Sequence, residues 1–198
     1  KVEGTDAFGD YGEAVVSIPK PTAGPRQFQC TGPFAPNTTA VNIAADFGQS
    51  NVTGGQVMEP GGSLAPGTVL LPGDPALRLD IAWADAIDMQ TPRRIAFTEA
   101  STWTVNGVGI GTSLADVEKA NGRPFRIQGF AGAGGGVVAD WQKGRLANIG
   151  NGCELGLQFA LPATASQGGV TSARFFSSND PAVRAANPTV GLFWVLYR

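Results

Sequence analysis

The side chains with the greatest capacity for chemistry in this sequence are carboxylates, because the chain contains no histidine. A serine or cysteine nucleophile normally needs a histidine base, so the Ser/His/Asp and Cys/His classes of enzyme are excluded, and histidine-based zinc sites with them. Two carboxylates could still form an acid/base pair of the glycosidase kind, which needs carboxyl groups about 5 to 10 Å apart. The candidates for such a pair are Asp80, Asp85, Asp88 and Asp140.

The sequence around these carboxylates is ordinary. Asp80 alternates with apolar residues, as a solvent-facing strand position does, and no Asp-x-Asp-x-Asp-Gly calcium loop occurs. We therefore expect no catalytic residues, no metal site and no cofactor. A carboxylate-based glycan hydrolase is kept as the alternative from the enzyme class.

The tryptophans are the candidates for ligand recognition. Trp83, Trp103, Trp141 and Trp194 could line a groove for a carbohydrate or a peptide, but each lies beside other apolar residues in a strand-like segment, which also fits a place in the core. The ligand-binding candidates are Trp83, Trp103 and Trp141, together with Asp140.

A glycine-rich run at residues 129–136 invites comparison with a phosphate-binding loop, because glycine lets backbone N–H groups approach an anion closely. Such loops stand between a strand and a helix, whereas Val137 to Trp141 looks like a strand. The run therefore predicts a hairpin loop or bulge.

Composition and charge exclude several classes of partner. Charged residues make up 15% of the chain, against roughly 25% in typical soluble domains, and the formal net charge is -2. The arginines are scattered from Arg26 to Arg198, so no basic face for phosphate neutralisation stands out and a nucleic-acid partner is not expected. The longest apolar runs are far shorter than the roughly 20 residues of a membrane span, so no transmembrane segment is expected in the mature chain.

Two cysteines, Cys30 and Cys153, both lie beside glycine in loop-like sequence. An even cysteine count without histidine fits an exported protein better than a cytosolic enzyme, so we predict one disulfide. The alternative is a pair of unpaired buried thiols that act as small hydrophobic side chains.

Three short helices are expected. Residues 37–48 offer Asn37 or Thr38 as a cap and Gly48 as a stop, while residues 111–122 contain Ser113 and Asp116 as a variant capping box. A third helix can start at Asp180 and end near Asn187.

Most of the remaining signal predicts strands. Residues 77–83 alternate between apolar and polar side chains with period two. Further candidates are residues 94–98, 101–105, 125–130, 136–141, 154–161, 173–176 and 189–197. Many strands joined by Gly, Pro and Asn turns predict an α+β fold with antiparallel sheets and two or three short helices.

The predicted domain organisation is an extended amino-terminal arm over residues 1–36, with one strand near Val15 and Val16, followed by a single α+β domain over residues 37–198. Superposing Gly48 on Gly122 aligns the first two helices, so the domain could consist of two helix-plus-sheet repeats, residues 37–105 and 106–198.

One block of residues resembles a known group of proteins. The sequence from Val108 to Phe125, followed by Gly129 and Phe130, is similar to a block in bacterial exported proteins and lipoproteins of unknown function. Its Gly-x-Thr or Ser, short helix and Gly-x-Pro pattern also resembles the repeats of the beta-lactamase inhibitory protein and of SmpA/OmlA outer-membrane lipoproteins. Residues 71–75, 81–83, 140–141 and 144–146 extend the resemblance, which covers about residues 37–146.

The resemblance implies a helix-plus-antiparallel-sheet fold, a cell-envelope setting and no catalytic residues. The sequence departs from the group at residues 130–136, where Ala and Gly replace the bulky aromatic and acidic residues expected there. The leading hypothesis is a non-catalytic envelope or secreted protein that binds an envelope protein or a ligand. Its expected location is periplasmic or secreted, with lipid anchoring through residues upstream of Lys1 as an option; a purely structural envelope domain is the third hypothesis.

Overall fold

The computed structural model describes residues 26–58, 63–132, 134–163 and 169–198. Most of the predicted arm, including the strand expected near Val15 and Val16, lies outside the described residues. The described end of that arm contributes Phe28, Cys30 and Phe34 to the hydrophobic core, where each is at most 6% exposed.

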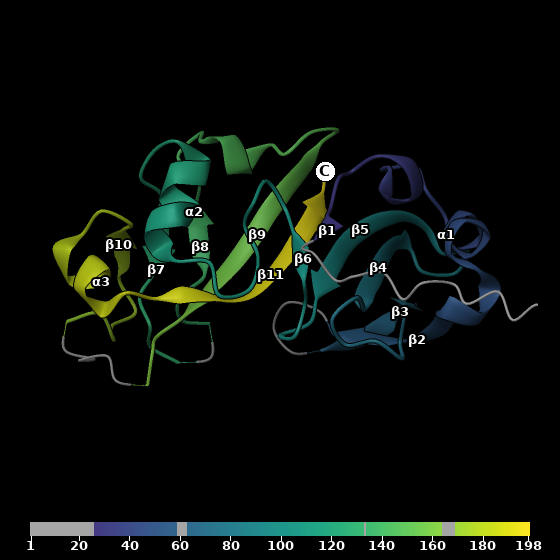
Figure 1. Ribbon diagram of the computed structural model, residues 1–198, viewed down its shortest axis with the longest axis horizontal. Coiled ribbons are helices and arrows are strands. Elements are labelled where there is room, and N and C mark those ends of the chain that lie inside the picture. Colours follow the sequence, from purple (N-terminus) through teal and green to yellow (C-terminus); the bar gives the residue numbers. More distant parts are fainter. Residues whose placement is uncertain (1–25, 59–62, 133, 164–168) are drawn as a thin grey trace, which may run out of the picture.

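A six-stranded antiparallel sheet forms the frame of the molecule (Figure 1). Its strands, in spatial order, are β2 (Val52–Met58), β3 (Leu64–Leu70), β4 (Leu79–Asp85), β5 (Gln90–Phe97), β11 (Thr189–Tyr197) and β9 (Cys153–Ala160). The last strand of the chain, β11, lies between β5 and β9 and so connects the first and second halves of the sequence in one sheet. The predicted antiparallel α+β fold is confirmed.

A smaller antiparallel sheet forms the part of the molecule drawn on the left of Figure 1. Its order is β10 (Phe175–Ser177), β7 (Arg126–Gln128) and β8 (Val138–Asp140). The glycine-rich run joins β7 to β8, two antiparallel neighbours, which confirms the hairpin interpretation. A bridge between Val137 and Gln158 links this hairpin to β9 of the large sheet.

Three α-helices form where the caps predict them, with one correction. In α2 (Leu114–Asn121) the Ser113 hydroxyl accepts from the amide of Asp116, and Gly122 ends the helix at φ 80°. In α3 (Pro181–Ala186) the Asp180 carboxylate caps the first turn. The cap of α1 (Ala40–Phe47) is Thr39 rather than Asn37 or Thr38. The prediction was wrong because Thr38 is buried and its carbonyl oxygen accepts a hydrogen bond from Thr91 instead.

The remaining elements are short. A two-stranded parallel pair joins β1 (Arg26–Gln27) to β6 (Trp103–Thr104), and three 3-10 turns occur at η1 (Gly32–Phe34), η2 (Gln49–Asn51) and η3 (Arg145–Ala147). One continuous core cluster contains Ile43 of α1 and Val117 of α2, and the Phe97 and Phe193 rings stack within it at 4.1 Å. The two-repeat hypothesis stays a prediction. In the structure, β11 of the second expected repeat pairs with β5 of the first.

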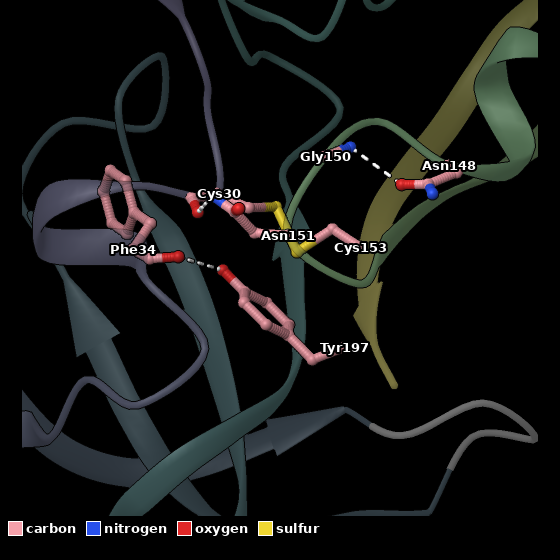
Figure 2. Close-up of a disulfide and its surroundings, with 7 residues drawn as sticks. All are labelled: Cys30, Phe34, Asn148, Gly150, Asn151, Cys153 and Tyr197. Atoms are coloured by element: carbon pink, nitrogen blue, oxygen red, sulfur yellow. Dashed lines mark hydrogen bonds between the residues drawn. A yellow bond between two sulfur atoms is a disulfide. The ribbon is translucent and has the colours of Figure 1, made fainter.

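The predicted disulfide between Cys30 and Cys153 is confirmed (Figure 2). It ties the segment before α1 to the start of β9, across a separation of 123 residues and with a Cα–Cα distance of 6.6 Å. Two hydrogen bonds reinforce this junction: Asn151 donates to the carbonyl oxygen of Cys30, and the Tyr197 hydroxyl donates to that of Phe34, both at 2.9 Å. Burial raises the pKa of the Tyr197 phenol above its ordinary value. A disulfide of this kind fits an extracellular location.

Candidate functional site

Three of the sequence-predicted ligand-binding residues lie in the core. Trp83, Trp103 and Trp141 are 2%, 5% and 3% exposed, and each indole N–H donates within the protein. The acceptors are the Thr68 hydroxyl at 2.9 Å, the Leu77 carbonyl oxygen at 3.0 Å and the Leu155 carbonyl oxygen at 2.6 Å. Trp83 and Trp141 therefore reach a ligand only if the surrounding core rearranges.

The candidate carboxylates lie in two separate regions: Asp80, Asp85 and Asp88 in β4 and the turn after it, and Asp140 in the small sheet. Asp80 pairs with Arg78 at 2.8 Å, and Asp85 accepts from the amides of Ile87 and Asp88 in the turn between β4 and β5. Asp140 lies at the end of β8, in the small sheet. Among the described residues, no group of three or more Cys, Asp or Glu side chains is placed to hold a metal ion.

Of the predicted ligand-binding residues, Asp140 lines the pocket that also gathers cationic side chains, whereas the nearly buried Trp103 borders a smaller pocket of about 250 Å³ without charged residues. The pocket beside Asp140 has a volume of about 490 Å³ and lies where the end of α2 meets the small sheet. Its cationic walls come from separate segments: Arg123 follows α2, Arg126 begins β7, and Lys143 follows β8. We call this the Arg123 pocket; its other lining residues are Pro124, Phe125, Asp140, Gln142 and Ser177.

The turn that carries Lys143 has an uncommon backbone. Gln142 and Lys143 both have positive φ, 54° and 60°, and the amide of Gly144 donates to the carbonyl oxygen of Trp141 at 2.9 Å. Two consecutive left-handed residues are the pattern of a type I′ turn, in which Asn-Gly is the favoured sequence. Gln-Lys adopts this conformation at a cost of about 1 to 2 kcal/mol for each residue, so contacts around the turn must hold it there.

Those contacts come from both sides of the turn. The Asp140 carboxylate accepts from the Gln142 amide at 2.6 Å and from Gln142 Nε2 at 2.7 Å. Asn121, which is 1% exposed, donates from Nδ2 to the Trp141 carbonyl oxygen at 3.1 Å. Backbone conformations of this kind persist where the surrounding structure over-determines them, and they cluster at binding and active sites.

The two arginines of the Arg123 pocket are held in place through different contacts. Arg123 donates from Nη1 to the Gln142 carbonyl oxygen at 2.8 Å, which leaves its remaining N–H groups to face other acceptors. The Cζ atom of the Arg126 guanidinium lies 4.9 Å from the centroid of the Phe175 ring, in a cation–π contact. The N–H groups of the guanidinium remain available to hydrogen-bond an anion. Both arginines are therefore pre-positioned before any ligand binds.

The positive charge of this pocket is only partly compensated within the described part of the chain, because one carboxylate, Asp140, lines the pocket beside the three cations. The ion pairs found there involve Asp80, Glu118 and Glu154, and none includes Arg123, Arg126 or Lys143. The Asp140 carboxylate accepts from two uncharged donors of Gln142 and keeps its negative charge, so the pocket has a net formal charge of about +2. Three cations against one carboxylate around a concave surface still create a positive potential that attracts an anion.

Sequence reasoning did not find this site, because the arginines look scattered along the chain. A usable signal was present in the two strand candidates that flank the glycine-rich run. Their antiparallel pairing sets Arg126 opposite Asp140, so the segment before the first strand and the turn after the second meet at one end of the hairpin. Arg123 lies in that segment, three residues before Arg126, and Lys143 lies in that turn.

No helix among the described residues is both long enough and apolar enough to cross a membrane. Comparisons of the chain with protein-family models, with curated proteins and with solved structures found no match. The resemblance to exported bacterial proteins therefore stays a prediction, and the functional argument rests on the Arg123 pocket.

Proposed function

We propose that the protein is a non-catalytic, exported binding protein that takes an anionic ligand in the Arg123 pocket. The observation that carries the proposal is the convergence of Arg123, Arg126 and Lys143 on one pocket of about 490 Å³, where Asp140 is the one carboxylate and forms no ion pair with them among the described residues. Arginine recognises carboxylate and phosphate groups through paired N–H donors, and lysine adds a mobile point charge.

The pre-positioning of these side chains supports binding as the task of the site. The Arg123 contact to Gln142 and the Arg126 contact to Phe175 hold the two guanidinium groups in advance, and the hydrogen-bonded turn fixes the backbone from which the Lys143 side chain extends. Ordering such long side chains on binding would otherwise cost about 0.5 to 1.5 kcal/mol each. A rigid set of donors therefore gains affinity for an anion.

The setting that we propose is the bacterial cell envelope or the secreted fraction, periplasmic or lipid-anchored. The Cys30–Cys153 disulfide supports an oxidising compartment. The sequence resemblance to exported proteins and lipoproteins points to the same setting.

The proposal is tested by titrating isotope-labelled protein with pyrophosphate and with galacturonic acid and following the amide NMR signals. We expect saturable shifts centred on Arg126, Gln142 and Lys143, with neutral galactose as the control that causes none. The Arg126→Gln variant should lose these shifts, whereas Arg93→Gln, a matched exposed arginine on β5, should keep them. Shifts that are absent up to roughly 10 mM ligand, or that spread over both sheets, would contradict the proposal; chemical turnover of the ligand would contradict its non-catalytic part.

A further inference from the structure

The Arg123 pocket has a neighbour that shares part of its wall. A second pocket, of about 440 Å³, is also lined by Arg123 and Pro124, and it extends over the carboxyl-terminal end of α2 towards α3. It adds two cations, Lys119 of α2 and Arg184 of α3, and one carboxylate, Glu118. We call this the Lys119 pocket.

The carboxylate of the Lys119 pocket is already engaged within the protein. Glu118 accepts from Arg184 at 2.6 Å through one oxygen and from the buried Ser178 hydroxyl through the other. Lys119 and Arg123 form no ion pair in the described part of the chain. The charge that the Lys119 pocket offers to a ligand is therefore positive.

The carbonyl end of α2, which would repel an anion, is covered. Arg145 donates from Nη2 to the Lys119 carbonyl oxygen at 2.9 Å and from Nε to the Ala120 carbonyl oxygen at 3.0 Å. The partial negative charge of a helix carboxyl terminus lies on such unpaired carbonyl groups. Because the Arg145 guanidinium binds these oxygens, an anionic chain can lie across the end of α2 and contact both pockets.

Both pockets are open and lined by exposed side chains. Lys119, Arg123, Arg126 and Lys143 are all exposed. Sites for drug-sized molecules usually enclose 70–90% of the ligand surface, whereas an open surface of this kind suits a ligand that runs along it. Two linked pockets with Arg123 on the shared wall suit a ligand that continues from one to the other and carries a negative charge for each.

We propose that the two pockets together bind a linear glycan that carries a carboxylate or phosphate on successive sugar units. This inference rests on the proposed function and names its ligand class. A polyanion is indicated by the two positive pockets with the shared Arg123, and a glycan is favoured over a nucleic acid by the disulfide, which fits an extracellular location.

The test compares ligands of one charge chemistry and increasing length. Calorimetric titrations with galacturonic acid, trigalacturonic acid and hexagalacturonic acid measure the effect of chain length, and a short polyribitol phosphate provides the phosphate form. We expect the hexamer, the phosphate glycan or both to bind at least roughly tenfold more tightly than the monomer, because a chain that occupies one pocket presents its next charge to the other at high effective concentration.

Lys119→Gln separates this inference from the proposed function. Lys119 lines only the second pocket, so its loss should weaken binding of the longer glycan several-fold and leave the monomer's NMR shifts in the Arg123 pocket unchanged. Arg93→Gln serves as the matched loss of one charge and should alter neither.

Three results would overturn the inference while leaving the proposed function intact. The first is no gain in affinity with length for either glycan, and the second is an equal effect of Lys119→Gln and Arg93→Gln on the affinity for the longer glycan. The third is binding of a DNA oligonucleotide or an anionic lipid vesicle, with a matched number of charges, that is tighter than binding of the glycan. Absence of binding by the monomer and by both glycans would contradict the proposed function itself.

Discussion

The buried side chain of Asn121 donates a hydrogen bond from Nδ2 to the carbonyl oxygen of Trp141, at 3.1 Å. The same nitrogen donates to the Arg123 carbonyl oxygen at 2.9 Å, and Oδ1 accepts from the Leu146 amide at 3.2 Å. One amide at the end of α2 thus connects the segment that carries Arg123 to the segment that carries Lys143.

Asn121→Ala should lower the free energy of unfolding by about 1 to 3 kcal/mol, because it removes three hydrogen bonds and leaves the buried Leu146 amide without its acceptor. It should also weaken anion binding, since the turn under Lys143 loses a support. Urea unfolding monitored by tryptophan fluorescence measures the stability. Asn148→Ala is the matched control: its side chain accepts from Gly150 in an exposed turn, and its loss should cost no more than about 0.5 kcal/mol. Equal losses in the two variants would contradict the role given to Asn121.

Lys143→Gly should separate stability from binding. Glycine tolerates the positive φ of this position, so the substitution should raise the free energy of unfolding by up to about 1 kcal/mol after its own entropic cost. The same change removes a cation from the Arg123 pocket and should weaken anion binding. Lys143→Ala is the control that loses the charge without relieving the backbone. Thermal melts and calorimetric titration of all three proteins test this; a Lys143→Gly protein that is less stable than Lys143→Ala would refute the account of the turn.

Gly156→Ala should destabilise the large sheet. Gly156 of β9 lies directly opposite Trp194 of β11, and a Cβ at this position would overlap the indole ring. Overpacking of this kind typically costs about 1 to 3 kcal/mol. Gly54→Ala, in the edge strand β2, is the matched control, because a Cβ there meets no atom within 4 Å. Differential scanning calorimetry should show a lower melting temperature for Gly156→Ala alone, and similar temperatures for both would argue against the packing described here.

Reduction of the Cys30–Cys153 disulfide should lower the free energy of unfolding by roughly 2 to 5 kcal/mol, the range for native disulfides. The bond joins two cysteines that are 123 positions apart in the sequence and links the segment before α1 to β9. Guanidinium unfolding with and without reductant measures the change. The Cys30→Ser/Cys153→Ser double variant should have the same free energy of unfolding as the reduced protein, and this value should not change when reductant is added. Two free thiols in protein recovered from an oxidising compartment would contradict the pairing.

Local sequence signals predicted the fold class and most of the elements. The capping box at Ser113 and Asp116, the Asp180–Pro181 start of α3 and the apolar alternation of residues 77–83 each depend on neighbours within one element, so they can be read without tertiary knowledge. Strand β11 also has its expected bounds. The disulfide could be predicted because the chain holds only two cysteines.

Strands β2 and β3 and the Arg123 pocket could not be found this way. Gly54, Gly55, Pro66 and Gly67 disfavour strand, yet these segments pair over their full length. The position of Gly67 explains its residue type, since a Cβ there would meet Val57 and the Ile81 carbonyl oxygen. The pocket depends on how α2, β7 and the turn after β8 pack together, and that arrangement depends on the long-range pairing of the small sheet rather than on any local pattern.

The most direct test of the central claim is the dissociation constant of pyrophosphate for the wild-type protein and for two charge-reversal variants, Arg126→Glu and Arg93→Glu, with circular dichroism to verify that all three are folded. Both variants change the net charge equally, but only Arg126 lines the Arg123 pocket. We predict that Arg126→Glu weakens binding at least roughly tenfold, which corresponds to about 1.4 kcal/mol, while Arg93→Glu changes it little. Equal weakening in both variants would show that net charge alone attracts the anion and would contradict binding in the pocket.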